Sequence, residues 1–233
     1  MDGPLVSVVV PVYNGDRYVA DALESVVAQD YRPIEIVVVD DGSTDRTSEI
    51  ALSLKEVRYA RQSNRGVSVA RNVGISMSHG ELIAFIDADD LWCPSKLSLQ
   101  VSYLLDHHEA GYVLAKQRCF LDPGSSAPPW FRAELLMDHV GFVPSALVVR
   151  RAVLEKIGVF DPELRIGEDS DWFFRARDAG VQVGVVTETL VYKRVHSDNL
   201  TSRTDIGHPL LLRIVRASLG RRHHVESPQG HPK

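Results

Sequence analysis

Three carboxylates follow one apolar run near the middle of the chain. Leu82 to Ile86 is wholly apolar, and Asp87, Asp89 and Asp90 come directly after it. A buried strand that ends in this way places its acids at the carboxyl edge of a sheet, where open α/β folds bind ligands. Crowded carboxylates need a cation or hydrogen-bond donors to neutralise them, and hard oxygen ligands suit Mg²⁺ or Mn²⁺. The spacing predicts a metal site, with a solvated acidic turn as the alternative.

A second pair of acids follows an earlier apolar run. Residues 34–39 are apolar apart from one glutamate, and Asp40 and Asp41 come next. The Asp41 carboxylate could accept a hydrogen bond from the N–H of a nucleobase or from a ribose hydroxyl. Capping of the helix that follows explains the same two acids equally well, and Asp40 is the better candidate for a structural role.

Two arginines flank the expected start of a third helix. Arg65 and Arg71 would bring guanidinium groups to a helix N-terminus, and this combination suits phosphate or uracil oxygens. For Arg71, an internal salt bridge is an equally good interpretation.

Glu168 and Asp169 open a later helix within a mostly apolar stretch. Burial there could raise the pKa of a carboxylate and so suit it to general-base work. Favourable placement at a helix N-terminus is the simpler alternative. A basic stretch at residues 192–196 ends in His196. An edge strand with solvated charges is one interpretation of this stretch.

These residues need a framework of alternating strands and helices. In the first half, we expect strands at residues 6–12, 34–39, 57–60 and 82–86, and helices at 16–29, 43–54, 69–77 and 97–105. Asn14 is expected to cap the first helix. Continuous apolar strands separated by helices predict a mainly parallel sheet in an α/β fold.

The second half is predicted to continue the same domain. We expect extended segments at 111–120, 146–149 and 181–195, and a helix at 168–179. A short helix at 207–219 could dock on the domain, pair with a second copy of the chain or contact a membrane surface. The remainder, 220–233, is expected to be disordered.

Composition narrows the class of protein. The 233 residues have a formal net charge of −5, which disfavours a broad nucleic-acid-binding surface. Two cysteines cannot supply a disulfide framework, and no apolar run approaches the roughly 20 residues that span a bilayer. We therefore expect a soluble cytoplasmic protein, with peripheral contact at the inner face of the membrane as one option.

The motifs together resemble family 2 glycosyltransferases of the GT-A fold. The resemblance covers residues 5–200 and rests on motifs in one order, at 8–14, 37–45, 64–74, 85–90 and 160–172. It implies a Rossmann-like mixed, mainly parallel sheet flanked by helices in a single domain. Residues 1–110 would bind the nucleotide-sugar donor, and residues 111–206 would bind the acceptor and complete the catalytic site.

The resemblance also assigns roles to residues. Asp89 would bind Mn²⁺ or Mg²⁺, and Asp169 would act as the base in a direct displacement that inverts the anomeric carbon. The donor would contact Pro11, Tyr13, Asp41, Arg65, Arg71, Asp87, Ala88 and His196. The basic stretch at 192–196, followed by residues 201–203, would close over the diphosphate or the metal once the donor is bound. The implied partners are a UDP-sugar and an acceptor hydroxyl on a glycan, a lipid-linked glycan or a small molecule.

Two other functions stay open at this point. A nucleotidyltransferase also uses an α/β sheet and acidic metal ligands, but the turn at residues 11–17 lacks the expected Gly-rich loop with a lysine. A nucleotide-binding or scaffold protein without turnover would keep the fold, and the presence of Asp87, Asp89 and Asp169 argues against it.

Overall fold

The computed structural model describes residues 3–128, 131–196, 199 and 213–221. Its strands are β1 (Val6–Val12), β2 (Ile34–Asp40), β3 (Val57–Arg61), β4 (Leu82–Phe85), β5 (Leu91–Trp92), β6 (Ala110–Leu121), β7 (His139–Val140), β8 (Leu147–Arg150) and β9 (Gln182–Val195). Its α-helices are α1 (Val19–Val27), α2 (Thr47–Ser53), α3 (Val67–Met77), α4 (Lys96–Asp106), α5 (Arg151–Ile157) and α6 (Glu168–Asp178). Short 3₁₀ helices cover Ala133–Leu136 and Pro144–Ala146.

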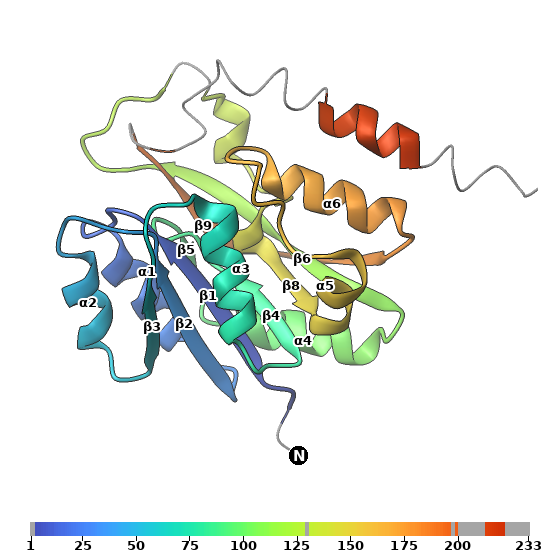
Figure 1. The fold of residues 1–233 in the computed structure, drawn as a ribbon, viewed down its shortest axis with the longest axis horizontal. Coiled ribbons are helices and arrows are strands. Elements are labelled where there is room, and N and C mark those ends of the chain that lie inside the picture. The colour runs from blue at the N-terminus through green and yellow to red at the C-terminus, as the bar shows by residue number, and fades with distance from the viewer. Residues whose placement is uncertain (1–2, 129–130, 197–198, 200–212, 222–233) are drawn as a thin grey trace, which may run out of the picture.

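One mixed sheet organises the described residues, in the order β3-β2-β1-β4-β8-β6-β9-β5 with β7 paired to β6 (Figure 1). Strands β3, β2, β1 and β4 are parallel to one another. Strand β8 is antiparallel to both of its neighbours, whereas β9 is parallel to β6 along most of its length. Most paired residues thus belong to parallel strands, which confirms the predicted mixed, mainly parallel sheet.

Helices cover both faces of this sheet. Because side chains alternate along a strand, Val8 and Val10 face a core shared with α1 and α4. Val9 faces the opposite core, which contains Trp172 of α6. Every residue of β1 and β4 is buried, as expected for strands covered on both sides.

The predicted cap of the first helix is wrong. Helix α1 begins at Val19, and no side chain caps its N-terminus. Asn14 instead has a positive φ of 49°, and its Oδ1 accepts a hydrogen bond from the backbone N–H of Thr44 at 2.8 Å. Asparagine tolerates this left-handed conformation better than most residues. Asn14 therefore connects the loops that follow β1 and β2, at the edge of the sheet that carries the candidate site.

A C-terminal helical segment lies against α6. Residues 213–221 are helical, and Ile214 and Ser218 are buried. Ser218 Oγ and Arg221 Nε both donate to the carboxylate of Asp178. The described part of the predicted 207–219 helix therefore docks on the domain. Residues 220–221, for which disorder was expected, are helical as well. Residues 207–212 and 222–233 lie outside the described residues.

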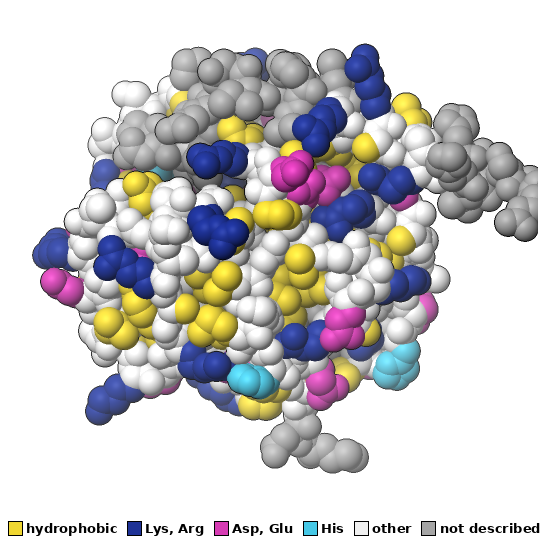
Figure 2. All heavy atoms as spheres, in the orientation of Figure 1, with side chains coloured by type: hydrophobic (Ala, Val, Ile, Leu, Met, Phe, Trp, Pro, Cys, Tyr) yellow, Lys and Arg dark blue, Asp and Glu magenta, His cyan; other side chains and the backbone are white. Residues whose placement is uncertain are grey.

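The surface of the face seen in Figure 1 mixes side-chain types. Lys and Arg side chains are spread over it among apolar ones, and acidic side chains gather near the start of α6 (Figure 2). Among the helices that the structure describes, none combines the length and the apolarity that a membrane span requires.

Candidate active site

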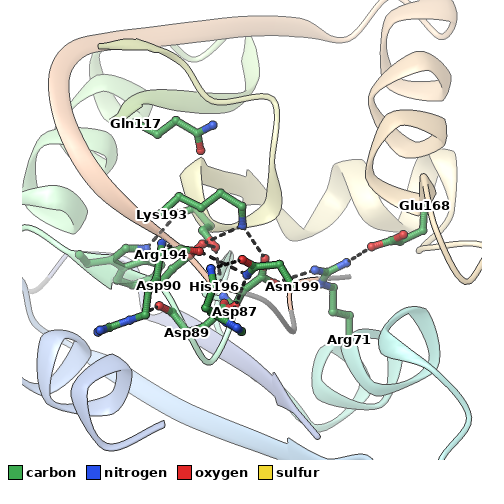
Figure 3. A network of polar contacts seen from close by, with 12 residues as sticks. Arg71, Asp87, Asp89, Asp90, Gln117, Glu168, Lys193, Arg194, His196 and Asn199 are labelled. Carbon is green, nitrogen blue, oxygen red and sulfur yellow. Dashed lines mark hydrogen bonds and ion pairs between the residues drawn. The ribbon is translucent and has the colours of Figure 1, made fainter. Parts of the chain in front are cut away.

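The three acids that follow β4 come together as predicted. One ligand oxygen from each of Asp87, Asp89 and Asp90 lies within 4.8 Å of the other two. Strand β9 crosses beside them and brings Lys193, Arg194 and His196 to the same place (Figure 3). The cluster therefore contains both the acids and basic groups that partly neutralise them.

Asp90 is the interior member of the cluster. It is fully buried, and it accepts hydrogen bonds from Ser145 Oγ at 2.7 Å and from the backbone N–H of Arg194 at 3.2 Å. Burial raises the pKa of its carboxyl to about 7 even though Lys193 opposes the shift, and the neighbouring acids add to it. With these partners Asp90 joins β9 to the loop before β8, which is a structural role.

Asp89 is the member best placed to hold a metal ion. Its Oδ2 lies 3.1 Å from Nε2 of His196 and accepts a hydrogen bond from Nδ2 of Asn199 at 2.9 Å. Two ligands at right angles on an octahedral ion, each about 2.1 Å from it, lie about 3.0 Å apart. The Asp89–His196 separation therefore fits a shared Mg²⁺ or Mn²⁺, provided that the Asn199 amide turns away.

Asp87 faces the opposite side of the cluster. Its Oδ1 accepts a hydrogen bond from Arg71 at 2.7 Å, and the other nitrogen of that guanidinium donates to Glu168 at 2.6 Å. Burial would raise the pKa of Asp87, but Arg71 and Lys193 hold it below its usual value. Arg71 is itself buried, so in the structure it forms the internal salt bridge that the sequence left open. Its contact with a donor stays a prediction.

The Arg71 bridge also places the predicted base. Asp169 lies at the start of α6, directly after Glu168. It is half-buried, and its Oδ1 accepts a hydrogen bond from the backbone N–H of Ser170 at 2.6 Å. Burial raises the pKa of the Glu168 carboxyl, although Arg71 opposes the shift. Asp169 differs from Glu168 in having solvent access.

Asp41 anchors the turn that leads into α3. Its Oδ1 accepts from Gln62 Nε2 and from the N–H of Arg65, and its Oδ2 accepts from the N–H of Gly66. An ionised carboxylate has about four acceptor positions. These three bonds leave about one position, on Oδ2, for an outside donor such as a nucleobase N–H. Gly66 has a φ of 93°, which favours glycine at this turn.

The other predicted donor-site residues differ in exposure. The Tyr13 ring follows β1 and is 52% exposed, and Arg65 is exposed as well. Pro11 is buried within β1, opposite Val39 of β2. Ala88 packs against the apolar core that includes α1, so its side chain is not directed at the acids. Pro11 is thus buried, and Ala88 is half-buried, at this edge.

Several residues of the cluster were not assigned individual roles from the sequence. Lys193 and Arg194 belong to the basic stretch before His196, so its charge was the available signal. Arg194 donates to Asp122 and to Asp21, and its guanidinium lies over the Tyr18 ring. Ser145 carried no signal, because an isolated serine in a loop has no characteristic spacing. Residues 201–203, which were expected to help close the site, lie outside the described residues.

Comparisons with known proteins identify the family and the fold. The family model described as glycosyl transferase family 2 matches residues 7–158. This chain belongs to glycosyl transferase family 2. An uncharacterised glycosyltransferase from Rickettsia typhi is 34% identical to this chain in an alignment of length 216, which covers 85% of this chain and 66% of that protein. The chain thus spans slightly less than two thirds of this relative.

Solved structures share the fold. A crystal structure of residues 1–349 of TarS from S. aureus, in complex with UDP-GlcNAc, has a TM-score of 0.77 and 25% identity, over 93% of this chain and 66% of that fragment. A mannosyltransferase from Pyrobaculum calidifontis, in complex with GDP-Man and Mn²⁺, has a TM-score of 0.65 and 20% identity, over 97% of this chain and 77% of that one. These likenesses confirm the GT-A architecture.

Proposed function

We propose that the chain is a metal-dependent, inverting glycosyltransferase that moves a sugar from a nucleotide-sugar donor to an acceptor hydroxyl. The observation that carries the proposal is the Asp89–His196 pair, whose 3.1 Å separation suits one octahedral ion at the carboxyl edge of the sheet. Residues 1–110 would bind the donor and residues 111–206 the acceptor.

The donor half supplies a binding surface for a nucleoside diphosphate. The remaining acceptor position of Asp41 suits the N–H of a uracil ring, and the exposed Tyr13 ring can lie against the base. The exposed Arg65 guanidinium can pair with phosphate oxygens. A UDP-sugar is favoured, because the TarS structure contains UDP-GlcNAc.

Asp89 and His196 would hold the divalent ion. An Mg²⁺ or Mn²⁺ bound there would neutralise charge on the departing nucleoside diphosphate. Asp87 would hold the ribose or complete the coordination shell through water. The Asn199 amide, which donates to Asp89, would exchange that bond for another partner.

Asp169 would remove the proton from the acceptor hydroxyl. Its half-buried carboxylate at the start of α6 is open to solvent, unlike Glu168, which Arg71 holds. A single base that acts opposite the leaving group leads to direct displacement and inversion of the anomeric carbon. The acceptor would be a glycan, a lipid-linked glycan or a small molecule, selected in part by the loop after β6.

The two alternatives are not favoured. The family match and the lack of a Gly-rich, lysine-bearing loop at residues 11–17 weigh against a nucleotidyltransferase. The arrangement of Asp89, His196 and Asp169 weighs against a scaffold protein without turnover. A cytoplasmic location, contact with the inner face of the membrane and pairing of two copies remain predictions.

The proposal is tested by assaying nucleotide release and product configuration. Purified protein would be incubated with UDP-, GDP- and dTDP-sugars, Mn²⁺ and a panel of hydroxyl acceptors that includes water. We expect release of UDP that stops when EDTA is added, and NMR should show a product with the opposite anomeric configuration. Release that persists in EDTA, or a product that retains the configuration, would contradict the mechanism. The donor assignment fails if no nucleotide is released from any sugar.

A further inference from the structure

Lys193 reaches from β9 into one side of the acid cluster (Figure 3). Its Nζ lies 3.3 Å from Oδ2 of Asp90 and 3.5 Å from Oδ2 of Asp87. The lysine side chain is 20% exposed. Burial alone would lower the pKa of Lys193, but the surrounding aspartates raise it above its ordinary value. The cluster thus contains an ammonium ion that belongs to the chain itself.

The two sides of the cluster differ as a consequence. On one side, Asp87 and Asp90 turn one oxygen each toward Lys193, and Asp87 turns its other oxygen toward Arg71. On the other side, Oδ2 of Asp89 faces His196 and Asn199 and has no ion pair with a lysine or arginine among the described residues. A divalent ion that approached the Asp87–Asp90 side would be repelled by the ammonium at close range.

We propose that Lys193 is a positioning residue that excludes the divalent ion from Asp87 and Asp90 and confines it to Asp89 and His196. This inference rests on the metal-dependent function proposed above. Because the ammonium also repels an ion on the Asp89 side, it weakens metal binding to the protein alone. The ion therefore depends on the donor diphosphate for much of its affinity, and it is bound and released together with the nucleotide.

A purely structural lysine would behave differently when it is replaced. Loss of a stabilising ion pair loosens the cluster and lowers metal affinity. If Lys193 instead acts by repelling the divalent ion, its loss leaves the acids with one more uncompensated negative charge and raises metal affinity. The sign of the change therefore separates the two roles.

The experiment measures Mn²⁺ binding from the EPR signal of the free ion, with and without UDP. The variants are Lys193→Met, the similarly uncharged Lys193→Gln, and the charge-preserving Lys193→Arg. Lys156→Met removes an exposed lysine from α5 and controls for a loss of overall charge. Titrations at pH 7.0 and 8.5, under nitrogen, allow for protonation of the carboxylates, and circular dichroism checks that each variant is folded.

In the absence of UDP, we expect Lys193→Met and Lys193→Gln to bind Mn²⁺ at least about tenfold more tightly than the wild type at pH 8.5. UDP should then increase their Mn²⁺ affinity by a smaller factor than it does for the wild type. Lys193→Arg and Lys156→Met should stay within about threefold of the wild type. Equal or weaker binding by both uncharged variants at both pH values would overturn the role of Lys193. If no variant binds Mn²⁺ even with UDP, the proposed metal site itself fails.

Discussion

Neighbouring acids along the chain have different partners and therefore different roles. Glu168 is buried and bound to Arg71, whereas Asp169, one residue further, is half-buried and accepts a hydrogen bond from the neighbouring N–H of Ser170. A general base must reach the proton that it removes. Of these two carboxylates, that of Asp169 has the solvent access that a base needs.

Replacement of Asp169 by Asn should separate catalysis from binding. We expect kcat to fall by about 10²–10⁴, because the amide cannot accept the acceptor proton in the transition state. The affinity for UDP and the free energy of unfolding should change little. Turnover with saturating donor and calorimetric UDP titration are the measurements, and Glu163→Gln is the matched control, since Glu163 is exposed in the loop before α6. A kcat within twofold of the wild type would rule out Asp169 as the base.

At the scale of elements, Arg71 joins three of them. It extends from α3, donates to Asp87 after β4, and donates to Glu168 at the start of α6. Ser68 on α3 also donates to the carbonyl of Leu164, in the loop before α6. The position of α6, and with it Asp169, is thus set against the acid cluster.

The Arg71→Met variant should lose both stability and catalysis. The change leaves the buried Glu168 carboxylate without its cationic partner and takes one of two cationic partners from Asp87, which costs about 3–5 kcal/mol. The double variant Arg71→Met, Glu168→Gln should lose less than the sum of the two single variants, because it removes one of the stranded charges. Urea denaturation of the wild type and the three variants measures this coupling. Strictly additive losses would show that the bridge does not act as a unit.

Local sequence patterns were enough to predict buried strands, but not the contacts between residues far apart in the chain. Strands β1 and β4 were predictable because fully buried strands are continuous apolar runs, and the acids after β4 follow from the same pattern. The contact between Lys193 and Asp90 was not predictable, because 103 residues separate the two along the chain. That encounter depends on the register between β9 and its neighbours, which a single sequence does not encode in any short motif.

At the scale of the whole molecule, the candidate site and a second polar cluster, around Glu35, lie at different ends of the parallel strands. Asp41 follows the carboxyl end of β2, whereas Glu35 lies near its amino end. Glu35 accepts hydrogen bonds from Ser7 and from the backbone N–H of His79, and it pairs with Arg58. Burial alone would raise the pKa of Glu35, but these bonds lower it to about 2.

The contacts of Glu35 make the free energy of unfolding depend on pH without involving the candidate site. Because the folded pKa lies below the unfolded value, Glu35 stabilises the protein above about pH 4.5, and that contribution is lost as the pH falls toward 2. Glu35→Gln should cost roughly 2 kcal/mol at pH 7, and the cost should shrink between pH 4.5 and 3. Urea denaturation across this range tests it, with the exposed Glu49→Gln as control. A cost that does not vary with pH would show that the carboxylate charge is not responsible.

The proposed metal site depends above all on one ligand, the carboxylate of Asp89. The most direct measurement is calorimetric titration of UDP into the wild type and Asp89→Asn, each with and without Mn²⁺. Asp106→Asn is the control, since it makes the same change at an exposed site at the end of α4. We predict that Mn²⁺ strengthens UDP binding at least about tenfold in the wild type and in the control, and not in Asp89→Asn. UDP binding that is unaffected by Mn²⁺ in the wild type, or equally strengthened in Asp89→Asn, would contradict the proposed metal site.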